Sequence, residues 1–212
     1  MMQLIKKGAE ADLYLDDWYG IRVVRKMRKV KAYRLSALDR SIRYERTGHE
    51  AQIMHEAKMA GVPTPTIYLV DFATTTIIME YIDGVRIKDV LNTSSIKKNI
   101  RLCETLGGLV GRLHRKRIIH GDLTTSNIII NKEGKIFFID FGLAEYSEEL
   151  EKQGVDLLLM KRALQSAHYN YAKDCFNAII EGYSAEMGKA HAMEVVNRVE
   201  EIEKRGRYAV ER

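Results

Sequence analysis

Apolar and polar side chains alternate along the first 82 residues in the way that is typical of β-strands. Ser36 is suited to cap a helix over residues 37–46. Thr47 has capping-box spacing to Glu50, which predicts a second helix that ends at Gly61. Two prolines follow and exclude helix there. The expected strands cover residues 3–7, 12–15, 21–26, 67–71 and 76–81, with a turn over residues 16–20.

After residue 83 the apolar positions take the period of α-helices. Residues 96–117 carry apolar side chains three and four positions apart, which predicts one long helix. A sheet-rich part followed by a helix-rich part predicts an α+β protein with two lobes, residues 1–82 and 83–212. Further helices are expected over residues 155–167, 169–181 and 184–204, with Gly182 and Gly206 as their stops.

Residues 118–142, with the sequence IIHGDLTTSNIIINKEGKIFFIDFG, interrupt the helical pattern with two apolar runs around a turn. This pattern is typical of a β-hairpin, and a turn at residues 133–134 would place Asn127 opposite Asp140. An amide oxygen and a carboxylate side by side are ligands that suit Mg²⁺. Asp122 lies five residues before Asn127 and would add a second carboxylate nearby. An ordinary hairpin with polar ends is the alternative interpretation.

Composition restricts the class of protein further. The chain is 46% hydrophobic and 30% charged, and no apolar run approaches the roughly 20 residues of a membrane span. The first residues are too charged for a signal peptide, so we expect a cytoplasmic protein with no membrane association. In that compartment Cys103 and Cys175 would stay reduced rather than form a disulfide.

The net charge of +5 is concentrated in two places. Residues 22–34 hold seven basic side chains, and residues 204–207 hold three more. Basic clusters favour contact with nucleic acid or with acidic proteins, and a solvated surface is the alternative.

The hairpin residues resemble the protein-kinase signature. HGD at 120–122 with Asn127 resembles the catalytic loop H-R-D-x-x-x-x-N, and DFG at 140–142 resembles the metal-binding D-F-G. The resemblance implies a phosphoryl-transfer site that uses ATP and Mg²⁺. By this resemblance Asp122 accepts the proton of the acceptor hydroxyl, while Asn127 and Asp140 hold the metal.

A kinase also needs a cover and a cation for the ATP phosphates. Gly8-Ala9-Glu10-Ala11 lies where kinases carry a Gly-rich loop, although a plain hairpin turn would also explain it. Lys26 follows the apolar run of the third strand and would contact the phosphates. Arg25 and Arg28 are its rivals. Glu50 is the expected partner of the cation, and the capping box is its alternative role.

The resemblance also assigns the adenine slot and a brace for the catalytic loop. Met79 would border the adenine pocket, and backbone groups of Glu80 and Ile82 would bind the base at a hinge near residue 82. Asp156, expected at the start of a helix, would brace the catalytic-loop backbone, with an ordinary helix-end carboxylate as the alternative.

Several features indicate a reduced kinase. The arginine of H-R-D is absent, thirteen residues separate Gly142 from Asp156, and no A-P-E sequence occurs. We therefore expect a two-lobed protein-kinase-like fold. It would have a small antiparallel-sheet N-lobe and a reduced helical C-lobe without an activation segment.

Three further stretches are similar to the small atypical kinase of the KEOPS (EKC) complex. They are KKGAEA at 6–11, a set of pairs (YR at 33–34, LD at 38–39, RT at 46–47 and EA at 50–51), and VDL at 155–157. The resemblance covers residues 4–167. It implies a serine/threonine protein kinase and ATPase that works with a Kae-type ATPase and a further small subunit in making threonylcarbamoyladenosine on tRNA. The family's basic tail is matched at residues 205–207 but not at 208–210, so tRNA contact through the tail or the basic run stays open.

Three other functions are alternatives. RIO-type kinases lack the glycine of D-F-G, which Gly142 supplies here. Aminoglycoside-type kinases share HGD…N but usually have a larger helical lobe than the residues after Gly142 can form. The third alternative is a non-catalytic scaffold that binds ATP only for its structure. The presence of Lys26, Asp122, Asn127 and Asp140 argues against it.

Overall fold

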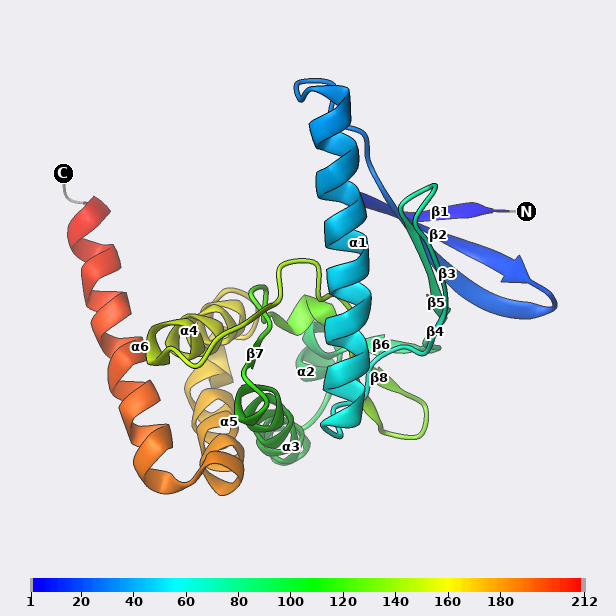
Figure 1. Cartoon of the computed structure of the whole chain (residues 1–212). Coiled ribbons are helices and arrows are strands. Elements are labelled where there is room, and N and C mark those ends of the chain that lie inside the picture. The colour runs from blue at the N-terminus through cyan, green and yellow to red at the C-terminus, as the bar shows by residue number, and fades with distance from the viewer. Residues whose placement is uncertain (1, 211–212) are drawn as a thin grey trace. The chain divides into compact units, whose positions relative to one another are not determined.

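The computed structural model describes residues 2–210, with the side chains of 206–210 left aside. The chain forms two compact units. The first unit comprises Met1–Glu56 and Thr64–Asp83, and the second comprises Ala57–Pro63 and Gly84–Arg212. The first is built on an antiparallel sheet and the second on helices, which confirms the predicted α+β class (Figure 1).

The sheet of the first unit has five antiparallel strands in the order β1-β2-β3-β5-β4. Trp18 pairs with Ile21, so the turn between β2 and β3 contains only Tyr19 and Gly20. The predicted turn over residues 16–20 is therefore too long. The strands are β1 Gln3–Lys7, β2 Ala11–Trp18, β3 Ile21–Arg28, β4 Ile67–Asp71 and β5 Thr76–Glu80.

One helix, α1 Ser36–Met59, follows the third strand and lies beside the sheet (Figure 1). The prediction of two helices with a break at Thr47 is wrong. The Thr47 hydroxyl donates to the carbonyl of Arg43, 2.6 Å away, which is a bond inside a continuing helix rather than a cap. Glu50 therefore has no capping role, and its side chain is available for a tertiary contact.

The second unit contains a three-stranded sheet, β6-β8-β9, and a two-stranded pair, β10-β7, within a group of helices. Its strands are β6 Gly84–Arg86, β7 Ile118–Ile119, β8 Ile128–Asn131, β9 Ile136–Phe138 and β10 Glu145–Tyr146. Its α-helices are α2 Ile87–Thr93, α3 Ile96–Arg115, α4 Leu150–Ala167, α5 Ala172–Met187 and α6 Lys189–Val210. Two short 3₁₀ helices are η1 Thr125–Asn127 and η2 Tyr169–Tyr171.

Helices α3 and α5 approach each other closely because glycines face each other across the contact. A Cβ atom at Gly107 would lie 1.9 Å from the carbonyl oxygen of Ile179, and one at Gly182 would lie 1.9 Å from that of Glu104. Gly182 is thus a packing residue inside α5, and its prediction as a helix stop is wrong. Gly206 likewise lies inside α6.

The β8–β9 hairpin has a different register from the one predicted. Asn131 and Lys135 close a loop of three residues, in which Gly134 has a φ of 81°. This is a type I turn followed by a left-handed residue. The predicted two-residue turn is wrong by one position, so Asn127 lies opposite Ile139, whose N–H donates to the Asn127 carbonyl at 3.1 Å.

Two findings bear on the class of protein. Among the described residues, none of the helices has both the length and the apolarity needed to cross a bilayer. Cys103 and Cys175 are buried free thiols.

Candidate active site

A buried carboxylate holds the loop that follows β7. Asp156 is completely buried, and its two oxygens accept the backbone N–H groups of His120 at 2.6 Å and Gly121 at 2.8 Å. Short hydrogen bonds to an ionised acceptor are stronger than neutral ones and fix the local backbone. The predicted brace is therefore present. Asp156 lies in the second turn of α4, which begins at Leu150, so the predicted helix start at residue 155 is wrong.

The same loop explains why the sequence has HGD rather than HRD. Gly121 has a φ of 76°, and a Cβ atom there would lie 2.3 Å from the carbonyl oxygen of Leu143. A side chain at this position would be strained by its backbone conformation and blocked by the backbone of Leu143. Arginine is therefore excluded at residue 121 by this backbone.

Asp122 and Asn127, predicted from their spacing, are in direct contact. The Asn127 amide nitrogen donates to the Asp122 carbonyl at 3.0 Å and to Asp122 Oδ2 at 2.7 Å. An amide nitrogen has two N–H groups, and both have an acceptor here. Asn127 Oδ1 is consequently the atom that this side chain can offer to a cation.

Asp140 follows β9 and is next to Ile139, which bonds to the Asn127 backbone. Its Oδ1 accepts the N–H of Gly142 at 3.2 Å. The Phe141 ring between them is fully buried and packs 4.8 Å from the His120 ring. The buried ring anchors the DFG segment to the catalytic loop.

The donor set of this loop fits Mg²⁺. Within residues 2–210, no group of three or more His, Cys, Asp or Glu side chains could enclose a metal ion. Mg²⁺ usually takes one or two protein oxygens and completes its octahedron with phosphates and water. Asn127 Oδ1 and the Asp140 carboxylate supply oxygens of that kind.

In the first unit, Lys26 of β3 and Glu50 of α1 form the predicted ion pair. Lys26 Nζ lies 2.5 Å from Glu50 Oε1, and the side chains are 8% and 2% exposed. The predicted role of this pair in ATP binding stays a prediction.

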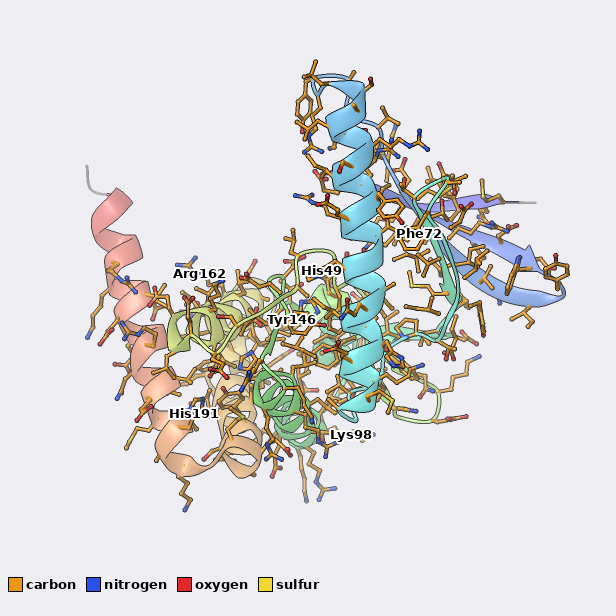
Figure 2. The ribbon with its side chains drawn as sticks, viewed as in Figure 1. His49, Phe72, Lys98, Tyr146, Arg162 and His191 are labelled. Carbon is orange, nitrogen blue, oxygen red and sulfur yellow. The ribbon has the colours of Figure 1, made fainter. Side chains whose placement is uncertain are left out.

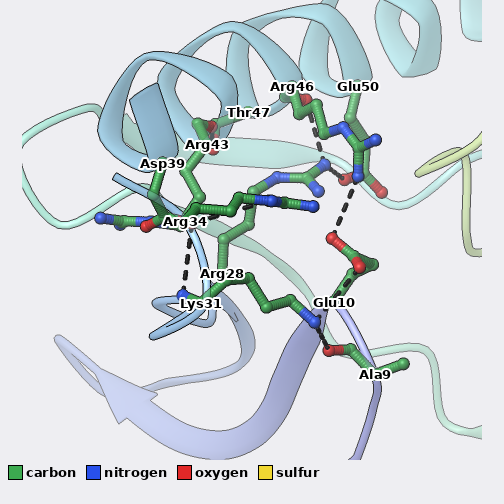
Figure 3. A network of polar contacts seen from close by, with 10 residues as sticks. All are labelled: Ala9, Glu10, Arg28, Lys31, Arg34, Asp39, Arg43, Arg46, Thr47 and Glu50. Atoms are coloured by element: carbon green, nitrogen blue, oxygen red, sulfur yellow. Dashed lines mark hydrogen bonds and ion pairs between the residues drawn. The ribbon is translucent and has the colours of Figure 1, made fainter. Parts of the chain in front are cut away.

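Arg28 is a second cation on the same carboxylate, which the sequence interpretation did not assign. Its guanidinium donates to Glu50 Oε2 at 2.6 Å and to the Arg46 carbonyl at 3.0 Å (Figure 3). Arg25 points elsewhere and pairs with Asp16. Residues two apart on a strand share a face, so the spacing of Lys26 and Arg28 could have indicated this arrangement.

The Gly8–Ala11 loop is attached to basic residues of the same unit. Lys31 Nζ donates to the Ala9 carbonyl at 2.6 Å, and the Glu10 carboxylate lies 3.3 Å from Lys31 and 3.0 Å from Arg46 (Figure 3). Burial raises the pKa of Glu10, but the Lys31 hydrogen bond and the charges of Lys31 and Arg46 outweigh it and bring the pKa below its ordinary value. Glu10 is therefore ionised at neutral pH.

Most of the basic run at residues 22–34 is neutralised inside the first unit. Ion pairs connect Arg25 with Asp16, Lys26 and Arg28 with Glu50, Lys29 with Asp12, Lys31 with Glu10, and Arg34 with Asp39. The run is thus a structural network, and its charge is not displayed as a free basic surface.

Of the predicted adenine-binding residues, Met79 and Glu80 end β5, and Ile82 follows two residues later. Met79 is 4% exposed and Ile82 is 8% exposed. The Glu80 N–H donates to the Thr66 carbonyl at 2.8 Å, so the carbonyl is the backbone group that Glu80 could offer to a base. Their contact with adenine stays a prediction.

Comparison with known proteins identifies the class. Residues 22–173 match the family described as the ABC1 atypical kinase-like domain. This match covers most of the chain, and together with the HGD…N and DFG geometry it defines an atypical kinase-like protein.

Two kinds of curated relative narrow the family. The chain is 44% identical over 213 residues to "KEOPS complex subunit Bud32" of Pyrococcus abyssi, with 98% of this chain and 96% of the relative covered. It belongs to the family of that KEOPS subunit, as the resemblance in the sequence implied. It is also 42% and 41% identical to proteins of Methanothermobacter thermautotrophicus and Methanosphaera stadtmanae named "Probable bifunctional tRNA threonylcarbamoyladenosine biosynthesis protein". The chain spans 36% of the length of each of these.

Proposed function

We propose that this chain is an Mg²⁺-dependent ATPase and phosphotransferase that acts as a KEOPS subunit in threonylcarbamoyladenosine modification of tRNA. The observation that carries the chemistry is the Asp122–Asn127 hydrogen bond at 2.7 Å. It leaves the amide oxygen of Asn127 available to a metal ion and holds the Asp122 carboxylate beside Asn127.

Each of the site residues has a separate role in the proposed phosphoryl transfer. Asn127 and Asp140 would hold Mg²⁺, which would neutralise charge on the phosphates of ATP when bound. Asp122 accepts the proton of the attacking hydroxyl, as that oxygen bonds to the γ-phosphorus and the bond from phosphorus to ADP breaks. In the first unit, Lys26, oriented by Glu50, binds phosphate, and the Gly8–Ala11 loop covers it. By this assignment the nucleotide-binding lobe is residues 1–82 and the catalytic lobe is residues 83–212, although Ala57–Pro63 belong to the second compact unit.

The acceptor is a serine or threonine hydroxyl of a protein, or water. Helix α4 begins at Leu150, soon after the DFG segment, so little chain is available to form a platform for peptides. This short connection favours ATP hydrolysis as the main reaction and protein phosphorylation as a secondary one.

The partners follow from the relatives. A relative named as a KEOPS complex subunit supports association with other subunits of such a complex. We propose that these are a Kae-type ATPase and a further small subunit. The cytoplasm stays the predicted location.

Contact with tRNA is proposed for the end of α6 rather than for the basic run. The run is paired internally, whereas Lys204 lies on the exposed face near the end of the helix. Residues 208–210, which depart from the family's tail, lie outside the described side chains. If tRNA binds through phosphate contacts, its affinity falls steeply as salt is raised from 50 to about 200 mM, because counterions are released. A flat response would limit the partners to proteins.

The test of the proposed reaction is ATP turnover by Asp122→Asn in the complete chain. The substitution keeps an oxygen for the Asn127 amide but removes the base, so turnover falls about 10²- to 10⁴-fold while the thermal unfolding temperature is unchanged. Glu145→Gln, an exposed residue paired with Lys152 in the same unit, is the matched control. Near-normal turnover in Asp122→Asn would contradict the assignment.

A further inference from the structure

A continuous set of hydrogen bonds connects the catalytic loop with helix α6 inside the second unit. It begins at the buried Asp156 carboxylate, which binds the loop backbone and also lies 3.3 Å from Nε2 of His114 on α3. The other ring nitrogen of His114, Nδ1, lies 3.0 Å from the hydroxyl of Tyr183 on α5. Both rings are buried.

The set continues through α4 to α6. The Tyr183 hydroxyl lies 3.3 Å from Oε1 of Gln153, and the same oxygen lies 2.8 Å from Nε2 of His191. Gln153 is 3% exposed, whereas His191 is half-buried on α6, where it is labelled in Figure 2. The outer end of the set is therefore close to the protein surface.

The number of protons in the set is limited. Burial, and then the negative charge of Asp156, raise the pKa of Tyr183, so its hydroxyl keeps one proton. Two acceptors compete for that proton: His114 Nδ1 and Gln153 Oε1. The Asp156 oxygen that faces His114 Nε2 already accepts the His120 N–H, so it is an acceptor and Nε2 carries a hydrogen. In that tautomer Nδ1 is the accepting nitrogen and takes its hydrogen bond from Tyr183.

His191 determines which of the two acceptors receives the Tyr183 hydrogen bond. The Gln153 oxygen only accepts, so the His191 nitrogen that faces it must be a donor. With that donor present, Gln153 is satisfied and the Tyr183 proton can serve His114. Without it, a buried carbonyl oxygen competes for the Tyr183 proton, and a buried acceptor without a partner is costly.

We propose that His191 is a positioning residue for the catalytic loop. It satisfies Gln153, leaves the Tyr183 hydroxyl free to donate to His114 Nδ1, and so keeps the His114 ring and Asp156 in the orientation that fixes the loop carrying Asp122. The proposal rests on the proposed ATP turnover for its kinetic readout. It connects α6 with the loop that carries Asp122 through hydrogen bonds.

The kinetic test compares His191→Leu with His191→Gln in the full chain. Leucine removes the donor, and we expect kcat for ATP turnover to fall about 3- to 10-fold, as for one lost hydrogen bond, with KM for Mg-ATP within about twofold. Glutamine supplies an amide N–H and is expected to restore kcat to within about twofold of the wild type. Glu194→Ala, an exposed change on the same helix, is the control and leaves both constants unchanged.

A second readout does not need turnover. In protein labelled with ¹⁵N-histidine, the His114 ring signals report which nitrogens carry hydrogen and which accept. We expect His191→Leu to shift the Nδ1 signal of His114 and His191→Gln to leave it in place. Wild-type kcat in His191→Leu, a failure of glutamine to rescue, or an unchanged His114 signal would each overturn the proposal. A wild-type chain without ATP turnover would contradict the proposed function instead, and the His114 signals would still decide this inference.

Discussion

The two units hold their key carboxylates by different means. In the first, Glu50 lies between the side-chain cations Lys26 and Arg28. In the second, the fully buried Asp156 is bound by two backbone N–H groups and a histidine ring. One unit relies on side-chain charge pairs, the other on backbone geometry.

This difference matches the task that each unit would perform. A proton acceptor must lie within hydrogen-bond reach of the reacting hydroxyl, and small misplacements reduce rates strongly. The hydrogen bonds that the loop N–H groups of His120 and Gly121 donate to the buried Asp156 carboxylate provide that precision. A phosphate-binding lysine acts as a point charge and tolerates more variation in position. The comparison predicts that changes in the second unit have the larger effects.

The largest effect is expected for Asp156→Asn. An asparagine offers one acceptor oxygen to the two N–H groups that Asp156 now binds, and it cannot keep the charge. Removing one side of a buried charged interaction costs about 3–5 kcal/mol in the free energy of unfolding. Urea unfolding followed by far-UV circular dichroism measures it. Asp39→Asn in the first unit is the comparison. An equally large loss in its free energy of unfolding would contradict the expected difference between the two units.

The packing of α3 on α5 gives the next effect. Gly107→Ala would place a methyl group against the Ile179 carbonyl and force the helices apart, at a cost of about 3 kcal/mol. The adjacent Gly108→Ala is the matched control, since its nearest neighbour across the contact is 3.8 Å away. The control should be neutral or more stable by up to about 1 kcal/mol, because alanine favours helix. Equal losses in both variants would contradict the close-packing account.

In the first unit, Arg28→Met removes one of the two cations on Glu50. The carboxylate keeps Lys26, so we expect a smaller loss of about 1–3 kcal/mol. Trp18 is the sole tryptophan and lies in β2, so its fluorescence during urea unfolding reports on this unit. Arg25→Met, which breaks a partly exposed pair with Asp16, should cost less than about 1 kcal/mol. The opposite order would show that Arg28 does not hold Glu50.

The smallest effects concern pH, and the two units should respond in different ranges. Hydrogen bonding from Arg43 holds the pKa of Asp39 below its ordinary value. The stability that Asp39 contributes is therefore present above about pH 4 and is lost as the pH falls through its native pKa. Burial lowers the pKa of His168 in the second unit, so stability there begins to decline already below about pH 6.5.

An acid titration separates the two ranges. Helical circular dichroism, which comes mostly from α2–α6 of the second unit, should change at a higher pH than Trp18 fluorescence in the first. His168→Asn should remove the earlier change and leave the later one. A single transition seen by both signals, unaltered by His168→Asn, would contradict this assignment.

The sequence predicted the proximity of Asp122 and Asn127 better than it predicted the elements that carry them. Spacing indicated Asp122, Asn127 and Asp140, because the catalytic loop and hairpin are short and local. The register of that hairpin was wrong by one position because the number of loop residues depends on the left-handed conformation of Gly134. The Asn127 carbonyl nevertheless accepts the N–H of Ile139, the residue before Asp140, so the backbones of Asn127 and Asp140 stay close to each other.

The remaining errors have a common cause, since tertiary contacts override local signals. Thr47 looked like a cap but lies inside α1, where Glu50 meets the sheet. Gly182 looked like a helix stop, but α3 approaches it too closely for any side chain. His114, Tyr183 and Gln153 gave no signal, because single polar residues on apolar helix faces acquire meaning only when their partners are known.

The central claim is that Asn127 and Asp140 provide the oxygens that bind Mg²⁺ on ATP. Calorimetry of Asp140→Ala with Mg-ATP, and with ATP in the presence of a chelator, tests it most directly, with Glu145→Ala as the control. The account predicts that affinity for Mg-ATP falls at least about tenfold, equivalent to about 1.4 kcal/mol, while affinity for metal-free ATP stays within about twofold. Equal losses for both forms of the nucleotide, or no loss for either, would contradict it.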